Sequence, residues 1–305
     1  MGSERGESPE MVEFRRYAER LGPMRGACPY LVLDVFTDTP LAGNPLGVVL
    51  DAEELDGPRM QRVARELNLS ETVFFLPPRE GGHARVRIFT PSEELPFAGH
   101  PVLGAAVVAG RALGLTAVNL ETGVGPVPVE LAGSDSDAPF GRMQQPLPEW
   151  GRYERASEIL DALGVEEAAL PVEAYRNGPV HVMVALDRSE EVAALRPDMT
   201  ALADHPRVGV SCFAGQGRLW TTRMFTPALG VPEDPATGSA AGPLALHLAR
   251  HGWIPFGETV EIHQGEKIGR PSVLYAAAHG APGRVERVEV GGKAVVVARG
   301  DYRIL

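Results

Sequence analysis

Two stretches of the chain combine polar residues suited to acid–base chemistry with the start of a segment rich in small residues. In the first stretch, Gly99 and His100 precede PVLGAAVVAG, and in the second, Asp234 in EDPATGS is followed by Gly238 and Ser239. Small residues on all sides predict a closely packed, central helix after each stretch. Because a helix start exposes backbone N–H groups and the positive end of the helix dipole, it favours an anion. Two such starts facing one cleft would suit a small carboxylate substrate.

A third candidate, Glu71, stands in NLSET at the mouth of the apolar run VFFL. Considered alone, a loop carboxylate is more often a solvated surface group. A lone histidine at a helix start, such as His100, is likewise more often structural. The positive helix end should, however, lower the pKa of His100 and favour the neutral imidazole. A neutral imidazole can accept or donate one proton, as acid–base chemistry requires. The presence of Asp234 and Ser239 near a helix start is explained about equally well by helix capping and by a role in a functional site. Their position opposite His100 in an internal repeat favours function.

The internal repeat joins two halves of the chain at one offset. The segment RIFTP at Arg87–Pro91 returns as RMFTP at Arg223–Pro227, and VVLD ending at Asp51 returns as VALD ending at Asp187, each 136 residues later. Matched blocks at one offset indicate a duplicated unit of strands wrapped on a central helix. A duplicated, two-lobed protein offers a ligand site in the cleft between its halves.

The length of 305 residues also favours two lobes, since single hydrophobic cores stop growing at about this size. We expect residues 1–28 to be an N-terminal extension, 29–132 a first lobe and 133–290 a second lobe. A C-terminal strand within 291–305 is expected to return to the first lobe. The acidic, Gly-containing stretch Gly133–Gly141 is the predicted connection between the lobes.

Charge and composition exclude several classes of protein. The chain has 29 Lys and Arg against 40 Asp and Glu, a net charge of −11. This balance disfavours nucleic-acid binding and attachment to an anionic membrane surface, both of which need a basic face. The most apolar stretch, Pro101–Gly110, is too short to span a bilayer. With only two cysteines, Cys28 and Cys212, the plain expectation is a reducing cytoplasm.

Metal and cofactor motifs are not found in the sequence. His247 and His251 are four residues apart in HLARH, but the metalloprotease pattern needs Glu where Leu248 stands. A core helix that runs out to the surface explains both histidines. There is no Walker A loop and no GxGxxG after a strand. We therefore expect no metal and no cofactor.

Four segments in order carry a resemblance to a known family: GNPLGVVLD, NLSETVFFLPP, RVRIFTPSEELPFAGHPVLG and EDPATGSAAGPLALHLARHG. Together they resemble the PhzF family of phenazine-biosynthesis isomerases, from about Tyr30 to the C-terminus. The resemblance implies an α+β, diaminopimelate-epimerase-like fold with two similar lobes, each a β-barrel-like sheet around a central helix. It also implies a cofactor-independent isomerase, commonly a homodimer.

The resemblance further implies a role for each candidate. Glu71 would be the acid/base that moves a proton in converting trans-2,3-dihydro-3-hydroxyanthranilate to an aminoketone. The substrate-binding residues that the resemblance implies lie at the two helix starts: Gly99, His100, Asp234, Gly238 and Ser239. Backbone N–H groups around Gly99–His100 and Gly238–Ser239 would hold the substrate carboxylate.

Two other functions stay open at this point. One is a PhzF-like isomerase or epimerase that acts on another small amino or cyclic acid, and the other is a non-catalytic protein that binds a small carboxylate. The two-thiol racemisation of the wider superfamily is disfavoured, because Cys28 falls in the expected extension and Cys212 in VSCFAG, well before the second helix start. The intact set of polar candidates favours an enzyme over a binding protein.

Overall fold

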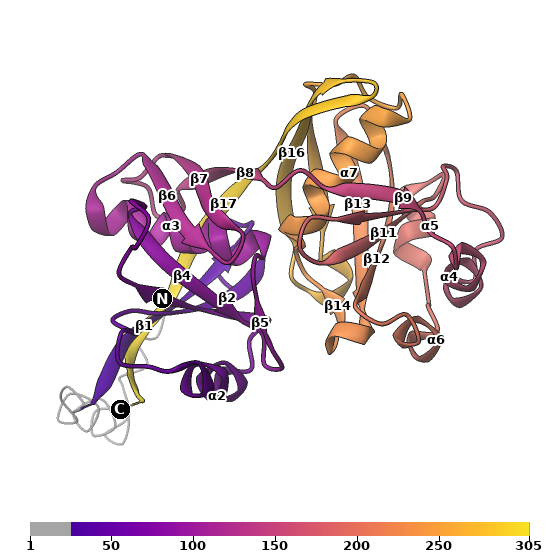
Figure 1. Cartoon of the computed structure of the whole chain (residues 1–305). Helices are drawn as coiled ribbons and strands as arrows, with labels where there is room; N and C mark the ends of the chain where they lie inside the picture. The colour runs from indigo at the N-terminus through magenta and orange to yellow at the C-terminus, as the bar shows by residue number, and fades with distance from the viewer. Residues whose placement is uncertain (1–25, 305) are drawn as a thin grey trace, which may run out of the picture.

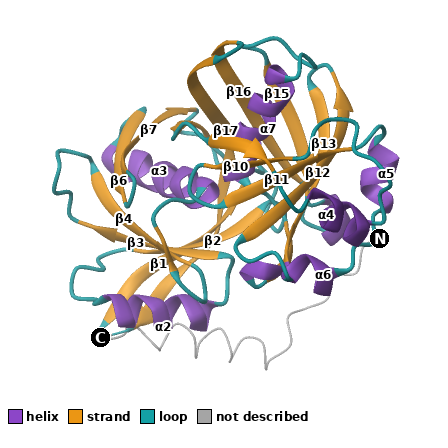
Figure 2. Ribbon diagram, turned by 45° about the vertical axis from the view of Figure 1, so that its right-hand side comes forward, coloured by secondary structure: helices purple, strands orange, loops and turns teal. Residues whose placement is uncertain are grey.

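The structure, a computed structural model, describes residues 26–304 and consists of two lobes side by side (Figure 1). The central helix of the first lobe is α3 (Gly99–Leu113), and that of the second is α7 (Gly238–Arg250). Figure 2 shows these two helices among the strands of the lobes, with α2 (Gly57–Leu67) on the outside. The remaining helices and helical turns of residues 26–304 lie in the second lobe: α4 (Ala156–Leu163), α5 (Ser189–Ala194), α6 (Met199–Ala203), η1 (Pro227–Leu229) and η2 (Glu266–Ile268).

Strands of both lobes join in one continuous sheet. Those of the first lobe are β1 (Ala27–Val35), β2 (Asn44–Val49), β3 (Glu71–Leu76), β4 (Ala84–Phe89), β5 (Glu94–Leu95), β6 (Ala117–Thr122), β7 (Gly125–Ala132) and β8 (Phe140–Gln145). Those of the second lobe are β9 (Glu149–Arg152), β10 (Glu173–Arg176), β11 (Val180–Ala185), β12 (Val208–Gln216), β13 (Leu219–Thr226), β14 (Val231–Asp234), β15 (Thr259–Gln264) and β16 (Ser272–Ala281). The last strand, β17 (Arg284–Arg303), belongs to both lobes.

The two lobes have the same strand pairing, which confirms the duplication. In the first lobe, β2 and β3 are parallel, β3 and β4 are antiparallel, and β4 and β6 are parallel. In the second lobe, the pairs β11–β12, β12–β13 and β13–β15 are parallel, antiparallel and parallel in the same order. The repeated RxFTP segments also make the same contacts. In each, the arginine pairs with a glutamate of the next strand and lies over the phenylalanine two residues on. The equivalent pairs are Arg87–Glu94 and Arg223–Glu233.

The chain crosses between the lobes twice. β8 pairs with β7 of the first lobe and with β17, and the chain then continues into β9 of the second lobe. β17 pairs first with β16 and then, through residues 294–303, with β1. β8 therefore leads from the first lobe into the second, and β17 leads from the second lobe back into the first. The antiparallel β8–β17 pair joins the two lobes.

Two predicted boundaries are wrong. The acidic stretch Gly133–Gly141 is not a connection between lobes: it makes the turn between β7 and β8, and its last two residues begin β8. Polar turn residues have the same composition as a linker, so only the long-range strand pairing distinguishes the two. The extension was expected to run to residue 28, but Ala27 and Cys28 pair with Arg303 and Tyr302 in the sheet. The rest of the expected extension, 1–25, lies outside the described residues.

Small residues let the central helix α3 pack on every side, as the sequence predicts. It is buried continuously from its first residue to Gly110. A Cβ added at Gly104 would lie 2.5 Å from Leu46 Cδ2, and one added at Gly110 would overlap Leu131 Cδ1. Larger residues at these positions would require the packed leucine side chains to move. Within residues 26–304, every helix is too short or too polar to cross a bilayer.

Candidate active site

The starts of α3 and α7 meet at the boundary between the lobes, as the repeat predicts. A Cβ added at Gly99 would lie only 2.6 Å from the carbonyl carbon of Gly238 and from the backbone nitrogen of Ser239. Neither preceding residue, Ala98 or Thr237, bonds a helix N–H group through its side chain. Two positive helix ends with no side-chain cap therefore face one another, which is an arrangement suited to binding an anion.

Glu71 and His100 come together beside this point. Asn68 ends α2 in the left-handed conformation (φ 51°), so the chain reverses and Glu71 becomes the first residue of β3. His100 is the second residue of α3. Glu71 Oε2 lies 3.2 Å from His100 Nε2, and both atoms are buried. The geometry between the two atoms is not that of a hydrogen bond, and neither atom has another hydrogen-bond partner among the described residues. Such orphaned buried groups are rare, and two together point to the place of a ligand.

The electrostatics of the pair suit proton transfer near neutral pH. Burial, reinforced by the negative charge of Asp234, raises the pKa of Glu71 to about 8. Burial lowers the pKa of His100 to about 3, although a hydrogen bond with the backbone of Pro45 acts in the opposite direction. At pH 7 His100 is therefore neutral, and Glu71 is mostly protonated but able to ionise. The surface interpretation of Glu71 is wrong, because its side chain is only 16% exposed and its Oε2 atom is buried.

Asp234 reaches the site from the second lobe and is held partly by the first. Asn44 Nδ2 of β2 donates to Asp234 Oδ1 (3.0 Å) and to the carbonyl of Ala236 (2.9 Å), while Thr237 Oγ1 donates to Asp234 Oδ2 (2.5 Å). Burial raises the pKa of Asp234, and these two side-chain donors oppose the rise. Because Thr237 and Asp234 bond each other, neither of them caps α7, so capping does not account for them.

Buried polar side chains surround Ser239, the second residue of α7. His181 Nε2 lies 3.0 Å from Ser239 Oγ, and Asn177 Nδ2 donates to the Ser239 carbonyl (3.1 Å). Gln145 Nε2 donates to the carbonyl of Gly238 (2.8 Å). The structure thus brings together all six predicted site residues, which lie at or beside the two helix starts.

Four residues near the site were missed by reasoning from the sequence: Asn44, Gln145, Asn177 and His181. Their contacts span from 32 to 192 positions of the chain, so no local spacing reveals them. The available signal was a polar side chain in an otherwise apolar strand, as for His181 in VHVMVA.

Both cysteine thiols lie in apolar clusters and not at the two helix starts. Cys212 of β12 faces the apolar cluster beneath α4 and α5, whereas its neighbour Phe213 faces α7. Burial raises the pKa of the Cys212 thiol well above its ordinary value, so it stays protonated. Burial also raises the pKa of Cys28, whose Sγ lies 3.6 Å from the carbonyl of Asp51. The geometry thus gives no support to racemisation by paired thiols.

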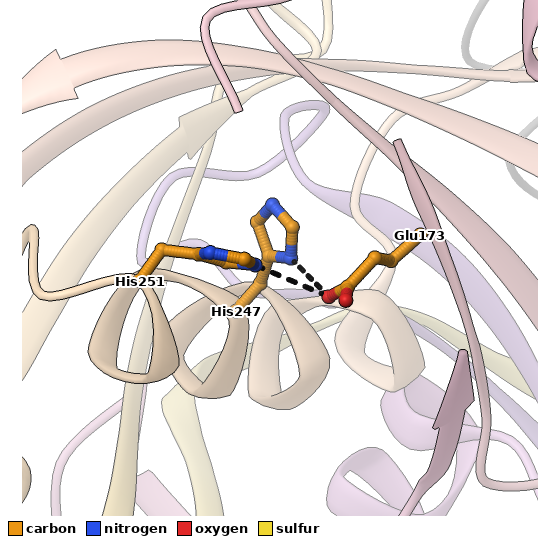
Figure 3. Close-up of side chains that lie close together, drawn as sticks. All are labelled: Glu173, His247 and His251. Atoms are coloured by element: carbon orange, nitrogen blue, oxygen red, sulfur yellow. Dashed lines mark hydrogen bonds and ion pairs between the residues drawn. The ribbon is translucent and has the colours of Figure 1, made fainter. Parts of the chain in front are cut away.

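A second cluster of titratable groups lies further along α7 (Figure 3). His247 Nδ1 and His251 Nε2 each lie 3.2 Å from Glu173 Oε2. Arg250 Nη1 donates to the same oxygen (2.5 Å), as does the hydroxyl of Tyr175 (3.0 Å). Burial raises the pKa of Glu173, but the hydrogen bonds outweigh it and leave the pKa well below its ordinary value.

This donor set fits a metal ion poorly. The guanidinium of Arg250 already neutralises Glu173 and occupies the oxygen that a metal would need. The cluster instead ties α7 to β10. As the sequence predicts for a core helix that runs outward, His247 is fully buried and His251 is partly exposed.

Comparison with known proteins places most of the chain in one family. Residues 33–300 match the PhzC-PhzF family, described as phenazine biosynthesis-like proteins. Trans-2,3-dihydro-3-hydroxyanthranilate isomerase of Pseudomonas aeruginosa is 53% identical over 271 residues, covering 89% of this chain and 98% of that protein.

Solved structures show the same fold. A PhzF-family phenazine biosynthesis protein of Bacillus anthracis superposes with a TM-score of 0.78 at 25% identity, covering 90% of this chain and 98% of that one. A hydroxyproline epimerase of Agrobacterium vitis, at 12% identity and a TM-score of 0.60, shares the fold over 91% of each chain. The expected α+β, diaminopimelate-epimerase-like fold is confirmed. The chain belongs to the PhzC-PhzF family of phenazine biosynthesis-like proteins.

Proposed function

We propose that this chain, an isomerase of the PhzF type, converts trans-2,3-dihydro-3-hydroxyanthranilate to an aminoketone in phenazine biosynthesis. The observation that carries the proposal is the buried Glu71–His100 pair beside two uncapped helix starts. The identity of 53% to an isomerase named for that substrate supports it. The substrate is a small carboxylate, which the two helix starts are suited to bind.

Glu71 carries the proton in this mechanism. In its ionised form it accepts the proton from the ring carbon that bears the hydroxyl group, and the electron pair moves along the conjugated system. The protonated Glu71 then gives the same proton to a carbon further along that system, which leaves an enol that becomes the ketone. The carboxylate is regenerated, so one residue serves as both base and acid. A pKa of about 8 lets it hold and release the proton near neutral pH.

The neighbouring groups orient the substrate. Neutral His100, 3.2 Å from Glu71, can accept or donate one hydrogen bond without adding charge. Asp234 is fixed by its two donors and faces the substrate amine and hydroxyl groups. Ser239 and the backbone N–H groups at Gly99 and Gly238 hold the carboxylate. No step needs a metal or an organic cofactor.

The test of the function is incubation of the purified protein with trans-2,3-dihydro-3-hydroxyanthranilate, followed by chromatography and mass spectrometry. We expect the substrate to be consumed and an isomer of equal mass to form. The Glu71→Gln variant, prepared in the same way, controls for a contaminating activity. Failure to turn over this compound, with turnover of another cyclic amino acid, would support the alternative of a related isomerase. Tight binding without any turnover would support the binding protein instead.

We also propose that the protein acts in the cytoplasm as a homodimer. Two buried, unpaired cysteine thiols support a reducing compartment. The mass of the protein measured by light scattering would test the assembly: a value near 65 kDa, about twice the chain mass of 32.6 kDa, is expected, and a monomer mass would contradict it.

A further inference from the structure

The duplication places one imidazole beside the start of each central helix, but on different elements. In the first lobe the imidazole belongs to the helix: His100 bonds the backbone of Pro45 in β2. In the second lobe the equivalent helix position is Ser239, and the strand position 136 residues after Pro45 is His181 in β11. His181 Nε2 lies 3.0 Å from Ser239 Oγ. Nothing in the function described so far uses this second imidazole.

The surroundings of His181 determine which ring nitrogen carries the proton. The residue is only 2% exposed, and its Nδ1 atom has no hydrogen-bond partner among residues 26–304. That side of the ring faces Gly209, where an added Cβ would lie 3.5 Å from Nδ1. A buried N–H group without an acceptor is rarer than a buried lone pair without a donor. The proton therefore lies on Nε2, which donates to Ser239 Oγ. Burial also lowers the pKa of His181 to about 3, so the ring stays neutral.

This tautomer sets the direction of the Ser239 hydroxyl. Because Ser239 Oγ accepts from His181, the hydrogen of the hydroxyl is left to be donated elsewhere. His181 is the only side-chain partner of that hydroxyl in the described structure, and the Gly99–His100 turn of α3 packs against the same backbone. The free hydrogen is thus available to a ligand at the helix starts.

We infer that His181 is a positioning residue that fixes Ser239 as a hydrogen-bond donor to the anionic group of the substrate. The inference rests on the proposed function, in which that group lies at the two helix starts. It predicts that His181 contributes to substrate binding without touching the substrate, and that it acts through Ser239.

The tautomer can be measured without any substrate. In ¹⁵N-labelled protein, two-bond correlations between ring nitrogens and carbon-bound protons distinguish the two neutral tautomers, and the spectrum of His181→Gln assigns the signal. We expect an Nε2–H imidazole that does not titrate between pH 5.5 and 8, a window chosen to lie above the pKa of about 3. An Nδ1–H tautomer, or titration inside this window, would overturn the inference even if the proposed substrate proved wrong.

A double-mutant cycle tests the coupling to Ser239. His181→Leu removes the donor, Ser239→Ala removes the hydroxyl, and His181→Gln is the matched control because its amide can donate from about the same place. We expect His181→Leu to raise KM about tenfold with a smaller change in kcat, since a bond to a charged group is lost. The double variant should match Ser239→Ala, and His181→Gln should recover most of the loss. Independent, additive effects, or a fall in melting temperature with KM unchanged, would show that His181 is merely structural.

Discussion

Gly99 of α3 and Gly238 of α7 lie so close that the backbone of Gly238 occupies the space that a Cβ on Gly99 would need. The two helices begin in different lobes and are 139 positions apart in the chain, as the residue numbers show. In the proposed mechanism, their contact sets the spacing of the two helix starts that bind the substrate carboxylate and, with it, the distance from the substrate to Glu71.

The first prediction concerns this contact. Gly99→Ala puts a methyl group 2.6 Å from the carbonyl carbon of Gly238, so the helix starts must move apart. We expect a loss of about 1–3 kcal/mol of unfolding free energy and a loss of most activity. Gly151→Ala is the control, because nothing lies within 4 Å of a Cβ added there. Urea denaturation and steady-state kinetics measure both effects. A fully active, equally stable Gly99→Ala protein would contradict the packing described.

The second prediction concerns the bond between lobes at Asp234. Asn44→Ala removes a donor to Asp234 Oδ1 and to the Ala236 carbonyl, and leaves both acceptors buried. We expect a loss of about 1–3 kcal/mol of unfolding free energy and a reduced kcat. Arg188→Ala, which removes an exposed ion pair with Glu191 at the start of α5, is the control and should change neither quantity. Unchanged kcat in the Asn44 variant would show that Asp234 needs no such support.

The third prediction is the pH dependence of kcat/KM. Glu71 must be ionised to accept the proton, and its pKa is raised to about 8. The rate should therefore rise with pH and level off above pH 8, because the profile reports the pKa of the free enzyme. Initial rates from pH 5 to pH 10, at low substrate concentration, measure it, and that range brackets the pKa. A rate that is flat between pH 5 and pH 8 would mean that a group with an ordinary carboxyl pKa, near 4.5, is the base.

The fourth prediction is sensitivity of the fold to acid. Burial lowers the pKa of His100 and His181 from 6.5 to about 3, so the folded state excludes protons that the unfolded chain binds. Their contribution to stability is complete above pH 6.5 and is lost as the pH falls from 6.5 toward 3. His181→Gln should show a smaller fall in melting temperature across this window than the native protein. Parallel falls in the two proteins would contradict the neutral state of His181.

Sequence patterns were sufficient to predict the two central helices and where they begin, because small-residue composition and the repeated RxFTP segment are local features. His100 could be named because it stands at a helix start, and Glu71 because NLSET resembles the family's motif, although the 3.2 Å distance between them could not be predicted. Asn44 and His181 could not be found, since their roles arise only when two lobes place distant strands beside the start of α7. The boundary near Gly133 was misplaced because an acidic turn and a linker have the same composition.

The central claim is that Glu71 carries the proton, and Glu71→Gln tests it most directly. The amide keeps the shape of the side chain, so binding of trans-2,3-dihydro-3-hydroxyanthranilate, measured by calorimetry, should change little. We expect kcat to fall by a factor of about 10² to 10⁴, the usual contribution of a positioned acid/base group, while the melting temperature is kept or raised. A Gln variant that keeps more than about a tenth of native turnover would leave the reaction without its base and contradict the mechanism.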